Sequence, residues 1–224
     1  MHQNRLRSVP IGVRLAETLR DRIVRGSIPA GTHLVEDRVA EEFDVSRGPV
    51  RDALRILSIE QLIEPVGRRG LRVIGLGPDG VRDLYAVRRG LETVAVAEVC
   101  RTRAEGGLGP LHRSVETMRG STGDVDAFAT SDLAFHRALY ETSGNRRLLA
   151  LWEQIEPLFA CILAITNSID GDLEPVVVDH STLLEVIASG DERRAVDVLE
   201  EHLDGSRRRI ITALEQVWAH SDGS

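Results

Sequence analysis

Apolar residues recur with helical spacing in three short stretches at the start of the chain. The first stripe consists of Leu15, Leu19 and Ile23, at i, i+4 and i+8, and predicts one helix. A second helix is predicted over residues 36–43. A third helix has its predicted buried face at Val50, Ala53, Leu54 and Leu57. Ser46 is placed to cap this third helix, and the short connection before it predicts a helix-turn-helix.

Two short extended segments follow, at residues 62–66 and 71–74, on either side of Gly67-Arg68-Arg69-Gly70. Glycines around two arginines predict a hairpin whose tip carries cations outward. Because a helix-turn-helix followed by such a hairpin is a winged helix, residues 1–76 are predicted to form a winged helix-turn-helix domain. Residues 77–80 contain several helix breakers and are predicted to be a linker.

From residue 81 onward the pattern is helical almost throughout, divided by short stretches that contain glycine. Six helices are predicted, near residues 81–104, 108–119, 124–142, 145–168, 173–188 and 191–218. No strand-like alternation interrupts them, so residues 81–224 are predicted to form an all-α antiparallel six-helix bundle. The predicted fold class is therefore mostly α, with one small β-hairpin.

The composition, 42% hydrophobic and 28% charged residues, is that of a globular protein and excludes a disordered or low-complexity chain. The longest apolar run, residues 158–165, is far shorter than the roughly 18 residues that cross a bilayer. The first residues lack the apolar core of a signal peptide. We therefore expect a cytoplasmic protein that does not contact a membrane.

The net charge of -7 argues against a general polyanion binder, but the charge is unevenly distributed. Residues 1–76 carry 13 arginines and 10 acidic residues, whereas the rest of the chain carries 15 arginines and 25 acidic residues. All 28 basic residues are arginine, whose planar guanidinium suits acceptors with two oxygen or nitrogen atoms. A basic surface is therefore expected in the first third of the chain.

Arg47 and Arg51 stand at i and i+4 near the start of the third predicted helix. Guanidinium groups there can pair with O6 and N7 of guanine in the major groove of double-stranded DNA. The helix end is suited to phosphate, and the hairpin tip to a neighbouring groove or the backbone. The residues predicted to make these further DNA contacts are Ser46 and Gly48 at the helix end and Arg68, Arg69 and Gly70 at the hairpin tip. A single exposed arginine is usually only solvated, but here several independent signals agree.

The first third also contains two recognisable stretches, GTHLVEDRVA at residues 31–40 and VSRGPVRDAL at residues 45–54. With them, residues 12–76 resemble the winged-helix domain of GntR-family bacterial transcription regulators. The resemblance implies that Arg47, Arg51 and the wing glycine Gly70 contact operator DNA. Family members often have arginine directly after the glutamate of the second helix, where this chain has Asp37. The phosphate contact of that helix is therefore expected to be lost or to move to Arg38.

Four ionisable residues of the second half lie on apolar stripes of predicted helices. Asp132 and His136 share one stripe at i and i+4, and His180 and His202 lie on the apolar faces of two later helices. Ionisable groups inside a bundle are costly unless they find partners, and one divalent metal ion would satisfy all four. A single inward histidine is more often a hydrogen-bonded core residue, but four such groups together favour a metal site.

Arg88 interrupts the apolar stripe of the first helix of the bundle and is therefore predicted to face inward. A buried guanidinium needs a carboxylate. Glu92 at i+4 is one candidate partner. The alternative is that Arg88 clamps a small organic acid whose other oxygens complete the coordination of the metal.

The second half contains further recognisable motifs: VRRGLE at residues 87–92, SDLAFHR at 131–137, SGN at 143–145, DH at 179–180 and HL at 202–203. With these it resembles the FCD effector domain of the FadR subfamily, and six helices rather than seven are similar to the VanR-like branch. The resemblance implies that Asp132, His136, His180 and His202 hold a divalent ion, commonly zinc or nickel. It also implies that Asn145 lies near the effector pocket, although Asn145 could equally cap the following helix.

These observations predict a ligand-responsive, metal-containing transcription regulator, expected to be a repressor and a homodimer on a palindromic operator. A small carboxylate effector beside the metal would change the separation of the two DNA-binding domains. One alternative is a metal-dependent hydrolase with an accessory nucleic-acid-binding domain, although no additional general base stands out on the inward faces. A regulator with a purely structural metal is the other alternative.

Overall fold

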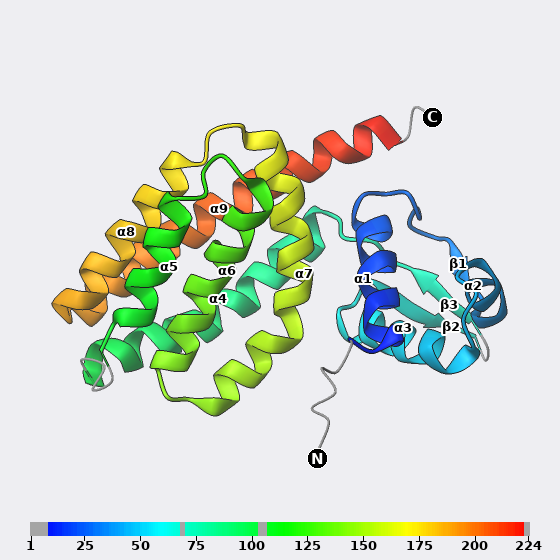
Figure 1. Ribbon diagram of the computed structural model, residues 1–224, viewed down its shortest axis with the longest axis horizontal. Coiled ribbons are helices and arrows are strands. Elements are labelled where there is room, and N and C mark those ends of the chain that lie inside the picture. The colour runs from blue at the N-terminus through cyan, green and yellow to red at the C-terminus, as the bar shows by residue number, and fades with distance from the viewer. Residues whose placement is uncertain (1–8, 68–69, 103–106, 222–224) are drawn as a thin grey trace, which may run out of the picture. The chain divides into compact units, whose positions relative to one another are not determined.

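The chain forms two compact units, Met1–Leu76 and Gly77–Ser224, in the computed structural model (Figure 1). The structure describes residues 9–67, 70–102 and 107–221. Its mostly helical architecture, with a small sheet after the N-terminal helix-turn-helix, confirms the predicted fold class.

The N-terminal unit contains three helices, α1 (Ile11–Val24), α2 (Glu36–Glu42) and α3 (Arg47–Ile59). α1 packs on α3 so closely that a Cβ atom added at Gly12 would lie 2.8 Å from the Cβ atom of Asp52. The turn between α2 and α3 contains Asp44 in a left-handed conformation, which aspartate tolerates better than most residues. The predicted apolar faces of α1 and α3 are buried between these helices and the sheet.

A buried ion pair joins the first helix to the end of the third. Nε of Arg20 donates a hydrogen bond of 2.8 Å to Oε2 of Glu60, and both side chains are almost completely buried. Because a buried charge is costly without its partner, this pair ties α1 to the C-terminal end of α3.

The sheet has three antiparallel strands in the order β1-β3-β2, namely β1 (His33–Leu34), β2 (Ile63–Val66) and β3 (Gly70–Val73). The predicted hairpin corresponds to β2 and β3, with Val66 opposite Gly70. β1 was not predicted, because a strand of two residues shows no alternating pattern. Its His33 pairs with Arg72 of β3.

The C-terminal unit contains the six predicted helices, each beginning and ending within a few residues of its expected bounds. They are α4 (Pro78–Thr102), α5 (Gly109–Arg119), α6 (Val125–Thr142), α7 (Arg146–Asp170), α8 (Glu174–Ser189) and α9 (Glu192–Ser221). The main difference is at the predicted linker, because residues 78–80 already belong to α4. Pro78 is compatible with the first helical position, since the N–H it lacks has no partner there.

Contacts within the bundle bring α4 against α6, α7, α8 and α9. Inward side chains of α4 therefore meet side chains from several other helices. α7 is long and apolar enough to span a membrane by length and composition alone. Its side chains Trp152, Phe159 and Ile162 are buried in the bundle, as in a core helix of a globular domain.

Candidate functional site

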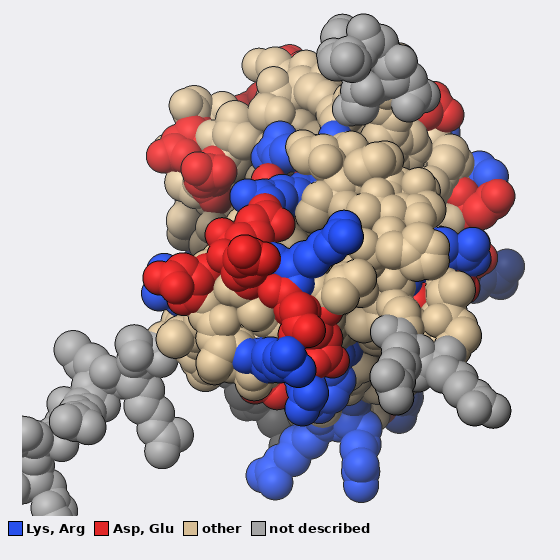
Figure 2. Space-filling view, turned by 90° about the vertical axis from the view of Figure 1, so that its right-hand side faces the viewer, with Lys and Arg blue, Asp and Glu red and all other residues tan. Residues whose placement is uncertain are grey.

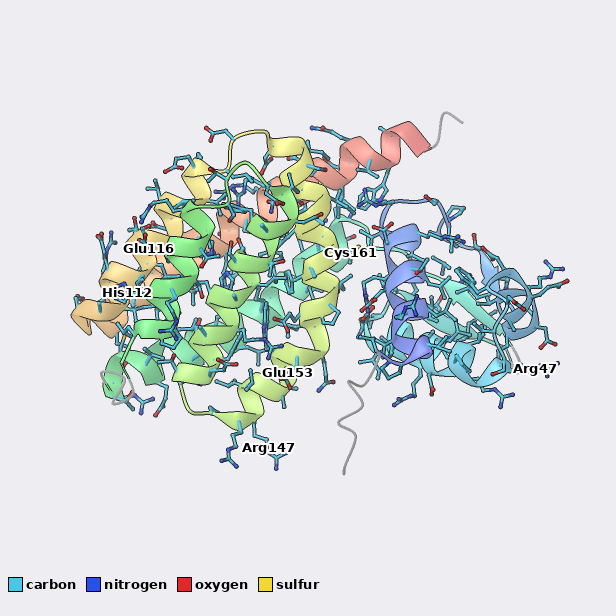
Figure 3. The ribbon with its side chains drawn as sticks, in the orientation of Figure 1. Arg47, His112, Glu116, Arg147, Glu153 and Cys161 are labelled. Carbon is cyan, nitrogen blue, oxygen red and sulfur yellow. The ribbon has the colours of Figure 1, made fainter. Side chains whose placement is uncertain are left out.

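The N-terminal end of α3 is exposed and begins with the residues predicted to contact DNA. Ser46 occupies the predicted N-cap position with an extended backbone, but its side chain does not make the expected capping hydrogen bond. Ser46, Arg47 and Gly48 are all exposed, and Figure 3 shows Arg47 at this end of the helix. Among the residues that the structure describes, the Ser46 hydroxyl caps no backbone group, and its exposed position allows it to bind an external group.

Each of the two arginines of α3 forms an ion pair with an acidic residue in the first turn of α2. Nε of Arg47 lies 2.6 Å from Oδ1 of Asp37, and Nε of Arg51 donates a hydrogen bond of 2.8 Å to Oε2 of Glu36. That hydrogen bond, with the negative charge of Glu36, raises the pKa of Arg51. Sequence reasoning noted Asp37 as a departure from the family pattern and missed both pairs.

A surface cavity of about 630 Å³ brings these four side chains together with the hairpin. Gly67 and Gly70, at the two ends of the hairpin tip, also line it. Arg38 of α2 is exposed but does not line this cavity. The predicted contacts Arg68 and Arg69 lie outside the described residues. Figure 2 shows arginine and acidic side chains interleaved on one face of the molecule.

In the C-terminal unit, α6, α8 and α9 bring three buried histidines together. One ring nitrogen from each of His136, His180 and His202 lies within 4.8 Å of the others. Asp132 adds a carboxylate, with Oδ1 3.7 Å from Nε2 of His136 and Oδ2 3.7 Å from Nε2 of His180. The four residues predicted as metal ligands therefore lie in one buried cluster.

Hydrogen bonds at the far side of two imidazole rings determine which nitrogens carry protons. Nδ1 of His136 lies 3.0 Å from the carboxylate of Glu92, and Nδ1 of His180 lies 2.8 Å from the carbonyl oxygen of Val176. Both partners accept hydrogen bonds, so in neutral rings each Nδ1 carries the proton and each Nε2 carries a lone pair. The two Nε2 atoms face each other at 3.4 Å.

Two lone pairs at this distance repel each other unless a cation or a proton lies between them. Burial lowers the pKa of His180 to about 4, although Asp132 opposes this. Burial, together with His180 and His136, lowers the pKa of His202 well below its usual range. These two rings are therefore neutral at pH 7 and have lone pairs available for a metal ion. The donor set, three imidazoles and one carboxylate, suits zinc and other divalent transition metals.

His202 differs from the other two histidines because its Nδ1 is buried and has no hydrogen-bond partner among the described residues. Its ring centroid lies 4.4 Å from that of His180. A buried imidazole nitrogen without a partner is unfavourable, and an ion held by the cluster would relieve this cost. The residues present therefore fit a divalent metal.

Glu92 and Arg88 of α4 continue the network away from the histidines. Nε of Arg88 donates a hydrogen bond of 2.7 Å to Oε1 of Glu92, which is the partner that sequence reasoning considered. Burial alone would raise the pKa of Glu92, but His136 and Arg88 outweigh it and lower the pKa to about 2. Glu92 is therefore ionised and bridges Arg88 to His136. Sequence reasoning missed this second contact, because it joins α4 to α6 across the core.

The guanidinium of Arg88 lies among aromatic rings, 4.6 Å from the ring centroid of Phe159 and 5.5 Å from that of Trp152. Within the described part of the chain, its Nη2 has no hydrogen-bond partner. Neither Nε1 of Trp152 nor the hydroxyl of Tyr140 has one. The rings of Tyr140 and Trp152 stack with centroids 5.2 Å apart, so these three polar groups lie in the same part of the bundle.

Asn145, predicted near the effector pocket or as a helix cap, is exposed at the start of α7. Its Oδ1 accepts hydrogen bonds from the backbone N–H groups of Arg147 and Leu148. The structure therefore places Asn145 at the N-cap of α7.

Both units match known protein families. Residues 12–73 match bacterial regulatory proteins of the gntR family, and residues 83–205 match the FCD domain. The gluconate operon transcriptional repressor of Bacillus licheniformis is 29% identical over 214 residues, which cover 92% of this chain and 86% of the relative.

Solved structures show the same fold. A GntR-family transcriptional regulator from Pseudomonas syringae pv. tomato is 28% identical with a TM-score of 0.60, covering 94% of this chain and 88% of that one. McbR/YncC of E. coli is 20% identical with a TM-score of 0.66, covering 94% of this chain and all of that one (100%).

The matched domains and relatives are transcriptional regulators and not enzymes, so the hydrolase alternative has no support from them. The chain belongs to the GntR family of bacterial regulatory proteins, carries an FCD domain, and is a DNA-binding transcriptional regulator.

Proposed function

We propose that this regulator is a repressor that binds a palindromic operator as a homodimer in the cytoplasm. Similarity to the gluconate operon repressor supports repression over activation, since the match covers 92% of this chain. A homodimer is supported by α4, which leaves Val87 and Val94, two turns apart on the same helix face, 55% and 48% exposed. Two DNA-binding units on one palindrome gain both affinity and specificity over one.

The proposed DNA contacts divide between bases and phosphates. Arg47 and Arg51 contact guanine, because both are exposed at the start of α3. The phosphate and groove contacts are Arg38, Ser46, Gly48, Arg68, Arg69 and Gly70. The exposed Ser46 hydroxyl, which caps no backbone group of α3, supports this assignment.

The C-terminal unit is proposed to hold a divalent metal, zinc or alternatively nickel, through Asp132, His136, His180 and His202. The single observation that carries this proposal is the pair of Nε2 atoms facing each other at 3.4 Å, both turned away from the hydrogen bonds that Nδ1 of each ring makes. Bound there, the ion would supply a fixed positive charge that ties α6, α8 and α9 together.

A small carboxylate is the proposed effector, with Arg88 as its main contact. The buried groups without partners, Nη2 of Arg88, Nε1 of Trp152 and the hydroxyl of Tyr140, support this class of ligand because all three can donate hydrogen bonds to carboxylate oxygens. Asn145 is proposed as a further contact of the effector, in addition to the cap hydrogen bonds that it makes.

Operator affinity tests the sensor. It should be measured with zinc and gluconate together, with zinc alone, and after chelation. Gluconate is the test acid because the relative from Bacillus licheniformis is a gluconate operon repressor, and acetate is the comparison acid. A sensor requires that the acid change operator affinity only when the metal is present. Equal affinity in all conditions contradicts the proposal. Thermal unfolding separates a structural metal, which raises the melting temperature regardless of acid, from a sensor, in which stabilisation by acid needs the metal.

A further inference from the structure

Two acidic residues lie directly beside the arginines that are proposed to read DNA. Glu36 and Asp37 begin α2, and their side chains are 39% and 59% exposed. Carboxylates near a DNA-binding surface repel the phosphate backbone and so weaken binding to every sequence. Their position beside Arg47 and Arg51 therefore needs a gain that offsets this repulsion.

A gain in folding stability is too small to offset this repulsion. The side chains of Arg47 and Arg51 are 63% and 65% exposed. Ion pairs this exposed contribute little to folding, because water and salt screen the charges and the long side chains lose conformational freedom.

The atoms that take part in the two pairs indicate what the gain is. In both pairs the carboxylate lies nearest to Nε of the arginine, at 2.6 Å for Asp37 and at 2.8 Å for Glu36. Across the part of the chain that the structure describes, the terminal nitrogens Nη1 and Nη2 of these arginines make no hydrogen bond. A bidentate contact with O6 and N7 of guanine can use these two nitrogens.

We propose that Asp37 and Glu36 are positioning residues for base recognition: each holds one arginine of α3 by its Nε, so that its terminal nitrogens meet guanine in a fixed orientation. The guanidinium is planar, so a contact at Nε restricts the direction of both terminal nitrogens. The arginine then loses less conformational freedom on reaching a base. The inference rests on the proposed base contacts of Arg47 and Arg51.

The two carboxylates therefore exchange affinity for discrimination between sequences. They lower the affinity for all DNA through repulsion, and they raise the preference for a guanine at the positions that Arg47 and Arg51 reach. Loss of a carboxylate should consequently strengthen binding to non-specific DNA and weaken discrimination at the same time. This opposite change separates a positioning role from simple repulsion.

The experiment uses the full chain and an operator selected with it from randomised duplexes. Dissociation constants are measured at several salt concentrations for this operator, for operators with single base-pair substitutions, and for a non-specific duplex. The variants are Asp37→Asn and Glu36→Gln, with Asp37→Glu to retain the charge. Glu42→Gln is the matched control, because it removes one charge from the same helix, where Glu42 pairs with Arg22 of α1 instead.

Asp37→Asn and Glu36→Gln should each bind non-specific DNA about twofold to threefold more tightly. A bidentate arginine–guanine pair discriminates between bases by roughly five- to a hundredfold. With the arginine no longer held, discrimination should fall by about threefold to tenfold. Glu42→Gln should strengthen non-specific binding by a similar factor and leave discrimination unchanged. Asp37→Glu should retain most of the discrimination. Unchanged melting temperatures check that the variants fold.

If Arg47→Ala and Arg51→Ala reduce discrimination, the base contacts stand, and two results would then overturn the inference. One is a parallel gain in affinity for all duplexes, which leaves only repulsion. The other is no change in any duplex. If instead the two arginine variants keep full discrimination, the proposed base contacts themselves fail, and the inference fails with them. In an Arg47→Ala background, Asp37→Asn should reduce discrimination no further, because the residue it positions is absent.

Discussion

Arg88 and Glu92 are 1% and 0% exposed, so each charge depends on the other for its stability in the core. Glu92→Gln would leave the guanidinium of Arg88 buried without a carboxylate next to it. Breaking one partner of a buried pair costs about 3–5 kcal/mol, and we expect a loss of this size in the free energy of unfolding. Urea denaturation of the metal-free protein measures it.

The matched control is the double variant Arg88→Met with Glu92→Leu, which removes both charges and keeps apolar volume. It should recover much of the lost stability, because paired burial of two charges is often no better than apolar packing. A loss of less than about 1 kcal/mol in Glu92→Gln would contradict the dependence of Arg88 on Glu92.

The depressed pKa of His180 predicts how the metal-free protein responds to acid. Its value is about 4 in the folded chain, against about 6.5 when unfolded. Between these values the unfolded state binds more protons, so the free energy of unfolding falls as the pH is lowered from about 6.5 towards 4. Above about pH 6.5 this group contributes no pH dependence. His202, with its pKa also lowered, acts in the same direction.

Thermal unfolding of chelated protein between about pH 7.5 and 5 measures this dependence. His180→Gln should flatten the curve of melting temperature against pH. His112→Gln is the control, because it also replaces a histidine by glutamine but at an exposed position on α5, outside the buried cluster (Figure 3). A wild-type curve as flat as that of His180→Gln would contradict the assignment.

Individual site residues were predictable where they broke a pattern. Asp132, His136 and Arg88 stand on apolar stripes of their helices, and this misplacement alone identified them. Their contacts across helices were not predictable, because the approach of Glu92 to His136 depends on how α4 packs on α6. The pairing of Asp37 with Arg47 depends in the same way on the angle between α2 and α3.

At the scale of elements, helices were predicted well because periodicity and breakers mark both their interiors and their ends. Gly190, for example, adopts the left-handed conformation that ends α8. β1 was missed because its two residues are stabilised by pairing with β3 and not by a local pattern. The extension of α4 to Pro78 was missed because proline and glycine composition there resembles a linker.

The N-cap of α7 gives a prediction at this scale. Asn145→Ala removes the acceptor for two backbone N–H groups and should lower the free energy of unfolding by about 1 kcal/mol. Asn145→Asp keeps an acceptor and should retain stability. Urea denaturation of both variants checks this, and equal stability of Asn145→Ala and the unchanged protein would contradict the cap.

The same variants separate the cap from the proposed effector contact. If Asn145 acts only as a cap, Asn145→Asp should keep the change in operator affinity that zinc and gluconate produce. Loss of this response at unchanged stability would instead assign Asn145 to the effector.

For the whole molecule, the charge asymmetry makes association important. Only the first 76 residues carry net positive charge, and the remaining residues carry a net negative charge that DNA repels. A single DNA-binding unit must therefore offset the repulsion of its own effector unit. Two units on one palindrome combine their contacts, which is why the proposed homodimer matters for operator affinity.

The uncovered face of α4 allows this assembly to be tested. Val87 and Val94 stand one heptad apart on α4, with the exposed Gly90 between them. If a second copy covers this face, Val87→Glu with Val94→Glu would bury two carboxylates in an apolar contact, and we expect mostly monomer at micromolar concentration. Sedimentation velocity measures the oligomeric state, and operator affinity should fall in parallel.

Val178→Glu provides the control for surface charge, because Val178 is 56% exposed on α8, as much as Val87 is on α4. It adds one of the two negative charges of the double variant at a valine as exposed as Val87, so a general effect of charge would lower operator affinity here by about half as much. A dimer that persists in the α4 double variant would contradict this interface. A double variant that is monomeric yet binds the full palindrome as tightly as the unchanged protein would show that two-fold association does not set operator affinity.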